Sequence, residues 1–454
     1  MKAITAQGKG DGDAAFFGHP KGLAYLAFTE VWEGFSYYGM QALLVLYMVS
    51  QLLMPGHVEH VAGLATLRGM AEAMTGSMTR LAFASQIFGL YAGLVNATPL
   101  LGGWLGDRVL GQTRTIILGA VLMTLGHLCM TSETLFLFAL LLLVLGAGCI
   151  KGNMAVQIGA LYGPDDPRRT QGFGVYMFVR NLGAFAAPLV CGTLGETLGW
   201  HYGFGVAAVA MAAALLIYLA GRKYLPPEPP VQRRRREHAP LTRDERRAVL
   251  GLFLAFIPYL LMFTAVYQAY NILPVWVSGH VDRQAGGLTV PVTWMYTFDG
   301  IATMIGIALT IRFWRLLESK GREPGSLGKM AIGSAMTCGA FLILTATSAL
   351  SAGPVALAWL LAFFVLLDFS FIWGEPPLRA FVSRHAPRLH ATVMMSLAIM
   401  SIAIANFVVG WLGRFYEPWG PARFWLLHAG IAATGVVAAL SLRPLIARLT
   451  DGTR

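Results

Sequence analysis

The sequence is poor in charged residues, in cysteine and in the motifs of nucleotide-driven proteins. Only 13% of its 454 residues are Asp, Glu, Lys or Arg, whereas a soluble domain carries about 25%. No glycine-rich phosphate-binding loop is present, so ATP is not the expected energy source. The ten histidines lack metalloenzyme spacing, and we expect no metal or other cofactor. The cysteines lie in apolar segments without a redox spacing and are interpreted as small core residues: Cys129, Cys149, Cys191 and Cys338.

Long apolar segments dominate the chain instead. Apolar runs recur from residue 22 to residue 446, and each has the length of about 20 residues that a helix needs to cross a bilayer. The runs are continuous rather than alternating, which predicts helices and not barrel strands. The first 20 residues are polar and glycine-rich, so we expect no cleavable signal peptide. The predicted fold class is an all-α membrane protein with twelve transmembrane helices near residues 22–49, 79–105, 113–131, 134–160, 171–196, 199–221, 247–276, 290–315, 327–349, 354–379, 388–414 and 421–443.

The formal net charge of +11 follows this topology, and no nucleic-acid partner is expected. Of 34 Lys and Arg residues, 27 fall in the termini or in loops after even-numbered helices, and five fall in the opposite loops. Both termini are therefore predicted to be cytoplasmic. A Pro-rich linker at 222–246, whose basic stretch at 233–236 can determine topology or bind anionic lipid, divides six helices in 1–221 from six in 247–454.

The end of the second predicted helix carries the string GGWLGDR at residues 102–108, followed by Gly111 and Arg114. Glycines let two helix ends approach closely, and Asp107 can pair with the arginines across a tight turn. A generic charged turn explains Asp107 and Arg108 but not the whole string. With six helices on each side of the linker, the string resembles the loop signature of the major facilitator superfamily. That resemblance implies two halves that rock around a midplane site.

The first predicted helix holds two carboxylates, Glu30 and Glu33, inside an apolar segment. Each charge costs roughly 2.5–3.5 kcal/mol near the bilayer centre, so we favour a functional role over a position at the membrane interface. Their spacing of three places them on one helix face, which Tyr37 and Gln41 continue. This stripe predicts a water-filled cavity. Lys151 in the fourth helix is a buried cation that needs a partner, and the two glutamates are its nearest candidates in the same half.

Several motifs together carry a more specific resemblance. The string HPKG at 19–22 is followed by ExxExFxYYG at 30–39, and GxGxxKGN stands at 146–153. With NLGA at 181–184 and GWHYGF at 199–204, these motifs resemble the proton-dependent oligopeptide transporter family over essentially the whole chain. The resemblance implies a symporter that uses the proton gradient to import di- and tripeptides across the inner or plasma membrane. We expect the partners to be peptide, protons and the lipid bilayer, and the protein to be a monomer.

The resemblance also implies roles for individual residues. In that family, acids of the first helix and a lysine of the fourth serve proton coupling and peptide binding. A substrate carboxylate that competes for the lysine changes how a neighbouring glutamate titrates, which couples proton to substrate; a purely structural ion pair is the alternative. The corresponding residues here are Glu30, Glu33 and Lys151, with Tyr37 and Tyr38 as the family's tyrosine pair and Asn181 as its fifth-helix asparagine.

The chain departs from the family pattern at this site. The family's arginine after the second glutamate is Gly34, and a later first-helix arginine is Gln41. The acid that faces this later arginine corresponds to Gln268, so both charges have become amides and neither is left unpaired. A family asparagine in the eighth helix corresponds to Asp299, a candidate for proton coupling and substrate binding. Three further family positions, a tyrosine, a tryptophan and the tenth-helix glutamate, correspond to Asn96, Ala398 and Phe371.

Two acids flank the lost tenth-helix glutamate. Asp368 and Glu375 are seven residues apart and share a helix face, so either can supply the missing acid. Glu375 is the candidate for substrate binding, although it precedes Pro376 and Pro377 and can instead belong to the cytoplasmic helix end.

Arg180 stands where the family carries an aliphatic residue. A guanidinium keeps its charge and needs carboxylates. The loss of an arginine at position 34 and its gain at 180 predict a relocated cation that contributes to substrate binding. An arginine that extends toward the membrane interface is the alternative.

The sequence thus predicts a symporter in which a substrate carboxylate meets Lys151 or Arg180 while the amino group meets carboxylates of the second half. The same fold carrying another small solute, such as an organic acid or a modified amino acid, is the main alternative because the pocket is altered. A multi-pass enzyme is disfavoured because no nucleophile–base pair or metal cluster stands in the helices, and an uptake assay separates a transporter from an inactive sensor.

Overall fold

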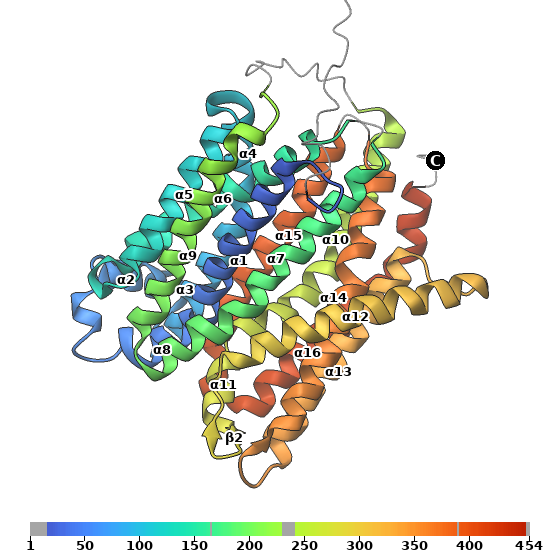
Figure 1. Cartoon of the computed structure of the whole chain (residues 1–454). Coiled ribbons are helices and arrows are strands. Elements are labelled where there is room, and N and C mark those ends of the chain that lie inside the picture. Colours follow the sequence, from blue (N-terminus) through green and yellow to red (C-terminus); the bar gives the residue numbers. More distant parts are fainter. Residues whose placement is uncertain (1–15, 164–165, 229–240, 388–389, 451–454) are drawn as a thin grey trace, which may run out of the picture.

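The computed structural model describes residues 16–163, 166–228, 241–387 and 390–450. These residues form one bundle of long helices (Figure 1). Helix α1 begins and α16 ends at one end of the bundle, whereas α8, α11 and β2 lie at the other end. We call the first the terminal end and the second the distal end.

The elements follow the predicted order. The helices of the first half are α1 (Lys21–Tyr47), α2 (Leu64–Thr75), α3 (Arg80–Ala97), α4 (Pro99–Leu105), α5 (Gln112–Cys129), α6 (Phe136–Ala160), α7 (Arg168–Ala187), α8 (Thr193–Thr197) and α9 (Trp200–Gly221). Those of the second half are α10 (Arg243–Val266), α11 (Leu273–His280), α12 (Trp294–Ser319), α13 (Ser326–Leu350), α14 (Leu357–His385), α15 (Ala391–Leu412) and α16 (Tyr416–Thr450). Short helical turns are η1 (Met48–Leu52), η2 (Val58–His60), η3 (Gly106–Leu110), η4 (Glu133–Leu135), η5 (Pro188–Gly192), η6 (Arg222–Tyr224), η7 (Tyr267–Tyr270) and η9 (Gly413–Phe415), and the strands are β1 (Val281–Asp282), β2 (Gln284–Ala285), β3 (Leu288–Thr289) and β4 (Val355–Ala356).

Nine helical segments of the described ranges are long and apolar enough to cross a membrane, and the last of these, Val393–Thr450, joins α15 and α16. The predicted first and third spans coincide with α1 and α5, which do not meet this criterion. The number of twelve spans therefore stays a prediction.

The predicted continuous helix at 247–276 is wrong in its middle. Helix α10 ends at Val266, η7 follows, and α11 begins only at Leu273. The backbone of Asn271 leaves helical geometry with φ −111° and ψ −83°, and Pro274 stands in the first turn of α11, where its missing N–H costs no hydrogen bond.

The apolar core forms two clusters that follow the order of the chain. The first draws on residues of α1 to α9, and the second draws mainly on α10 to α16 together with Ala42, Leu46 and Leu81. Thr242 and Glu245 form a capping box that starts α10. Residues 229–240 of the predicted linker, with its basic stretch, lie outside the described residues.

Helices α1 and α7 pack closely because α7 carries a glycine at their contact. A Cβ at Gly183 would stand 2.1 Å from the carbonyl oxygen of Val31, so no other residue fits there. Arg180 stands one turn before Gly183 on α7, and a Cβ at Gly34 of α1 would lie 3.4 Å from its carbonyl oxygen and 3.6 Å from its Cγ, which are ordinary van der Waals contacts. Position 34 thus faces Arg180 across the contact of α1 and α7.

The glycines of the GGWLGDR string also allow close packing. A Cβ at Gly102 would stand 2.0 Å from the carbonyl oxygen of Gly148 on α6, and Asn153 Nδ2 donates to the Gly102 carbonyl at 3.0 Å. The predicted pairing of Asp107 with the neighbouring arginines is not found among the ion pairs of the described residues.

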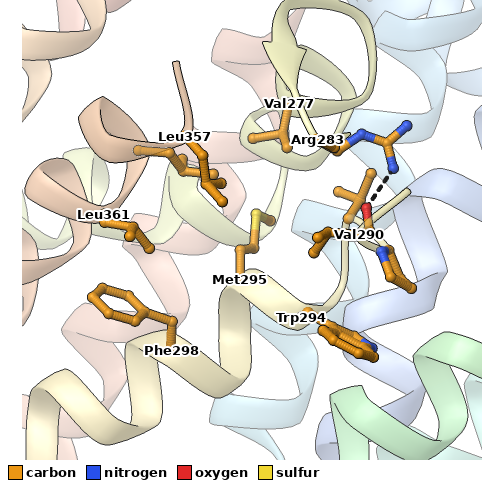
Figure 2. Close-up of a pocket in the computed structure, with 11 residues that line it drawn as sticks. Val277, Arg283, Val290, Trp294, Met295, Phe298, Leu357 and Leu361 are labelled. Atoms are coloured by element: carbon orange, nitrogen blue, oxygen red, sulfur yellow. Dashed lines mark hydrogen bonds between the residues drawn. The ribbon is translucent and has the colours of Figure 1, made fainter. Parts of the chain in front are cut away.

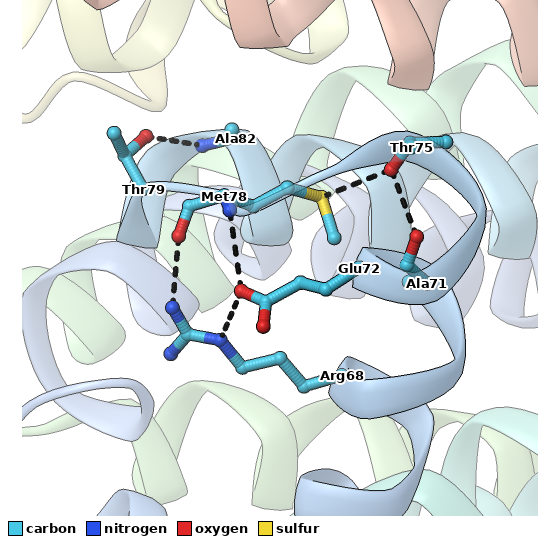
Figure 3. A network of polar contacts seen from close by, with 7 residues as sticks. All are labelled: Arg68, Ala71, Glu72, Thr75, Met78, Thr79 and Ala82. Atoms are coloured by element: carbon cyan, nitrogen blue, oxygen red, sulfur yellow. Dashed lines mark hydrogen bonds and ion pairs between the residues drawn. The ribbon is translucent and has the colours of Figure 1, made fainter.

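A polar network orders the distal loop between α1 and α3 (Figure 3). Arg68 Nε donates to Glu72 Oε1 at 3.0 Å, and its guanidinium also donates to the carbonyl of Met78 at 2.8 Å. These hydrogen bonds from Arg68 and the Met78 N–H lower the pKa of Glu72. The guanidinium of Arg414 donates to the carbonyl of Thr75, which joins this loop to the second half.

Candidate functional site

Two buried carboxylates of α1 form the centre of the candidate site. Glu30 and Glu33 are only 3% and 1% exposed. One oxygen of Glu30 and both oxygens of Glu33 accept no hydrogen bond in the described part of the chain. Unsatisfied buried carboxylates are costly, so this site requires a proton, a cation or a ligand in some state of the protein.

The guanidinium of Arg180 reaches this carboxylate pair from α7. Its Nε lies 3.3 Å from Glu30 Oε1, and its carbon atom Cζ lies 6.0 Å from the centre of the Tyr38 ring. Gly34 of α1 faces this side chain, and a Cβ there would stand 3.6 Å from Cγ of Arg180. The structure therefore brings Arg180 to Glu30 rather than directing it away from the bundle.

The ammonium of Lys151 approaches the same region from α6. Its Nζ lies 4.1 Å from the centre of the Tyr37 ring, a distance typical of a cation–π contact. Lys151 forms no ion pair among the described residues, so direct pairing with Glu30 or Glu33 is not found. The lysine acts on Glu33 through space, as do Glu30 and Arg180. Two carboxylates thus face two cations.

Tyrosines from both halves meet beside this cluster. The rings of Tyr37 and Tyr38 stand 5.1 Å apart and at 81° to each other. The rings of Tyr267 and Tyr270 in η7 stand 6.3 Å apart, and Tyr270 packs against the apolar clusters of both halves. Sequence analysis missed Tyr267 and Tyr270, although two tyrosines three residues apart beside Gln268 are a recognisable polar stripe.

The second half contributes a different set of acids. Tyr270 donates its hydroxyl hydrogen to Asp299 Oδ2 at 3.1 Å. Thr303, four residues after Asp299 on α12, donates to Asp368 Oδ1 at 2.9 Å. Because residues four apart share a helix face, this bond joins the α12 face that carries Asp299 to Asp368 on α14, which sequence separation concealed.

Three other predicted site residues lie apart from these contacts. Gln268 is fully buried, and its amide atoms have no hydrogen-bond partner in the described residues. Glu375 pairs with Arg379 one turn further along α14. Asn181 is exposed, and the structure does not bring it into contact with the charged cluster.

Contacts between the two halves gather at the distal end. Glu196 of α8 accepts hydrogen bonds from the N–H groups of Val292 and Thr293 at 2.8 and 2.9 Å and from the Thr293 hydroxyl at 2.7 Å. Asn271 Nδ2 donates to Ser85 Oγ at 2.7 Å. These bonds cross from one half to the other and hold the distal end closed.

An apolar pocket lies near the same end and is unrelated to the charged cluster (Figure 2). Its volume is about 170 Å³, and its walls come from α11, α12, α14 and the residues that flank the β2–β3 hairpin. Met295, Phe298 and Leu361 line it, and the guanidinium of Arg283 is held at its edge by the carbonyl of Val290 at 2.8 Å. It lacks the convergent polar groups of a site for a charged solute.

Known proteins resemble this chain along nearly its full length. A di-/tripeptide transporter of Lactococcus lactis subsp. cremoris is 25% identical, with 97% of this chain and 98% of the relative covered. The peptide transporter YePEPT of Yersinia enterocolitica is 26% identical over 88% of this chain and 89% of its own length.

Solved structures show the same architecture. A crystal structure of the peptide transporter POT in complex with sulfate has a TM-score of 0.83 at 26% identity, covering 96% of this chain and 97% of that one. A POT family transporter in complex with 5-aminolevulinic acid has a TM-score of 0.82 at 21% identity, covering 96% and 98%, and this likeness concerns the fold alone. The predicted helical membrane fold of the major facilitator type is confirmed. The POT family model matches residues 113–237 and 236–418, and the chain therefore belongs to the POT family.

Proposed function

We propose that this protein is a proton-coupled symporter that imports di- and tripeptides by alternating access. The relatives named as di-/tripeptide and peptide transporters support the substrate class, and the charged cluster supports proton coupling. In this proposal residues 1–221 and 247–454 are two six-helix bundles in the inner or plasma membrane, with both termini cytoplasmic. The closed distal end then faces outward, and the structure is closed to the outside.

The observation that carries the proposal is the ion pair between Arg180 and Glu30 beside the unpaired Glu33. A substrate carboxylate can bind a guanidinium in two parallel hydrogen bonds, whereas Glu30 approaches Arg180 through Nε at 3.3 Å. When it binds Arg180 or Lys151, Glu30 and Glu33 lose their counter-charges in a low-dielectric site. A proton then neutralises a carboxylate that is otherwise buried without a cation.

Acids of the second half can bind the ammonium group of the substrate. Asp299 accepts a hydrogen bond from Tyr270, which packs against the apolar clusters of both halves, and Glu375 is a further acid on α14. The proton gradient drives the cycle, because each charge that moves inward gains about 2.3 kcal/mol per 100 mV.

Uptake by purified protein in liposomes tests this function. An inwardly directed proton gradient should drive accumulation of a radiolabelled dipeptide, and excess unlabelled di- and tripeptides should compete. Free amino acids should not. Competition by amino acids or organic acids but not by peptides would favour the alternative of another small solute, which the altered residues at positions 34 and 299 keep open. If the gradient drives uptake of none of these solutes, transport is contradicted.

Labelling of single cysteines tests the orientation. Cysteines introduced at Arg233 and Arg283 should react with a membrane-impermeant thiol reagent from opposite sides in intact cells. Reaction from the same side would contradict the proposed topology.

A further inference from the structure

A hollow with cations in its wall lies at the terminal end of the first half, where α1 meets α9 and η6. A Cβ at Gly221 would stand 2.4 Å from Cβ of Tyr25, so the glycine is what allows α1 and α9 to approach each other beside the hollow. The volume of the hollow is about 460 Å³, and five residues of these three elements line it: Tyr25, Leu219, Ala220, Arg222 and Lys223.

Lys21 adds a third cation at the edge of this hollow. It stands one turn before Tyr25 on α1, and its Nζ donates to the Tyr224 hydroxyl at 3.3 Å. The ring of Tyr224 stacks on that of Tyr25, with 5.2 Å between their centres. The ammonium groups of Lys21 and Lys223 lie 4.4 and 5.2 Å from the centre of the Tyr224 ring. Two ammonium groups thus share one aromatic ring, and Arg222 precedes them in the hollow wall.

No acid balances these three cations within the described ranges. None of the ion pairs there includes Lys21, Arg222 or Lys223, and neither α9 nor η6 contains Asp or Glu. Glu228, the next acid along the described chain, accepts a hydrogen bond from the Thr113 N–H instead. Like charges held close together repel each other, so an anion in the hollow would relieve this repulsion.

An exposed apolar stripe leads from the hollow along α9. Val209, Leu216 and Leu219 are exposed, and their spacings of seven and three residues place them on one side of the helix. Helix α9 lies in a segment apolar enough to cross a membrane, and lipid tails can cover such a stripe because they are equally apolar. The stripe ends at Leu219, in the wall of the hollow. A lipid chain that lies on it would therefore place its polar end beside the cations.

We propose that the hollow binds the phosphate of an anionic glycerophospholipid, with the headgroup among Lys21, Arg222 and Lys223 and an acyl chain along the stripe on α9. Basic pockets between spanning helices attract anionic headgroups, and here an aromatic ring holds two of the three cations in place. A zwitterionic headgroup fits less well, because the cluster would repel its cationic group. In the topology proposed above this lipid belongs to the cytoplasmic leaflet, but the site itself does not depend on the transported substrate.

Thermal unfolding of the purified protein in a neutral detergent tests this site. Dioleoylphosphatidylglycerol should raise the unfolding temperature and the effect should saturate, because a ligand that binds only the folded state stabilises it. Dioleoylphosphatidylcholine, which has the same chains, and inorganic phosphate should not. The triple variant Lys21→Gln, Arg222→Gln, Lys223→Gln should need about 10-fold more phosphatidylglycerol, or more, for half of the effect.

A second triple variant is the matched control. Arg315→Gln, Lys320→Gln and Arg322→Gln together remove as many exposed charges from the end of α12 and the turn after it, and the lipid effect should keep its wild-type concentration dependence. If the control loses the effect to the same extent as the first triple variant, the total charge and not the hollow attracts the lipid, which overturns the proposal.

Ala220→Trp tests the hollow without changing its charge. The residue is exposed, so the unfolding temperature without lipid should stay near that of the wild type, whereas the indole fills the space for the headgroup and should weaken the lipid effect. A wild-type response in this variant or in the first triple variant overturns the proposal, as does an equal response to phosphatidylcholine. An equal response to inorganic phosphate overturns the lipid as the source of the phosphate. None of these measurements involves transport, so their outcome is independent of the proposed peptide uptake.

Discussion

The two halves of the bundle surround their buried acids with different partners. In the first half, Glu30 and Glu33 face Arg180 and Lys151. In the second half, Asp299 and Asp368 accept hydrogen bonds from the hydroxyl groups of Tyr270 and Thr303, and none of the ion pairs of the described residues includes either aspartate. The first-half cluster contains two cations, so it is neutral overall when both of its acids have lost their protons. The second-half acids have no paired cation and are then negatively charged.

In the proposed symporter, this difference assigns the two ends of a zwitterionic substrate. Cations in the first half attract a carboxylate, and uncompensated acids in the second half attract an ammonium group. A ligand that spans the interface therefore has one orientation. The tyrosines between the two sites provide rigid, partly polar walls for the segment that joins its charged ends.

The largest expected effect comes from replacing Glu33, the first-half acid whose two oxygens accept no hydrogen bond from the described residues. Glu33→Gln should reduce gradient-driven uptake by about 100-fold, equivalent to about 2.7 kcal/mol, because the amide cannot carry the coupled proton. Exchange of labelled for unlabelled peptide without a gradient should persist. Both rates are measured in the same liposomes.

The matched change is Glu30→Gln, which removes the partner of Arg180 instead. If both glutamine variants accumulate peptide at the wild-type level, the first half does not couple protons, and the comparison between the halves loses its basis. Asp299 would then be the next coupling candidate.

A smaller loss, about 30-fold or about 2 kcal/mol, is expected for Arg180→Ala. The substrate carboxylate then keeps only Lys151, and Glu30 is left as a buried, unpaired charge. A Cβ at Gly34 would stand 3.6 Å from Cγ of Arg180, so an arginine at 34 would start beside the place that the Arg180 side chain occupies.

The double variant Arg180→Ala with Gly34→Arg should therefore recover part of the uptake, because the new arginine restores a guanidinium beside α1. Arg180→Lys separates charge from geometry, since lysine cannot bind a carboxylate in two parallel hydrogen bonds. Normal uptake by Arg180→Ala would contradict the idea of a relocated cation.

Much of the first-half site could be predicted because it is local in sequence. The spacing of Glu30 and Glu33 places them on one face of one helix, and the absent arginine at 34 points to Arg180. The position of Lys151 over Tyr37 rather than beside a carboxylate could not be predicted, because it depends on side-chain geometry between α1 and α6.

The second-half pair was less accessible from the sequence. Asp299 and Asp368 are 69 residues apart, and only the packing of α12 on α14 joins the helix face that carries Asp299 to Asp368. The break in the seventh predicted helix was also missed, since apolar residues continue through it. That break is what turns Tyr270 toward Asp299.

The smallest expected effect concerns the contact between the two halves at the distal end rather than their charged sites. Glu196 of the first half caps the N-terminus of α12 in the second half with three accepted hydrogen bonds. A carboxylate at a helix N-terminus contributes typically 0.3–1 kcal/mol beyond its hydrogen bonds, so Glu196→Ala should weaken distal closure by about 1–2 kcal/mol.

The measurement is the distance distribution between spin labels on the distal ends of α8 and α11, in which the population with a separated distal end should rise several-fold. Glu196→Gln keeps an acceptor oxygen but not the charge. Its population with a separated distal end should lie between those of the wild type and Glu196→Ala. An unchanged distribution in Glu196→Ala means that the remaining contacts, such as that of Asn271 with Ser85, are sufficient to hold the distal end closed. In both Glu196 variants transport should slow only modestly, because the acids proposed to bind proton and substrate remain in place.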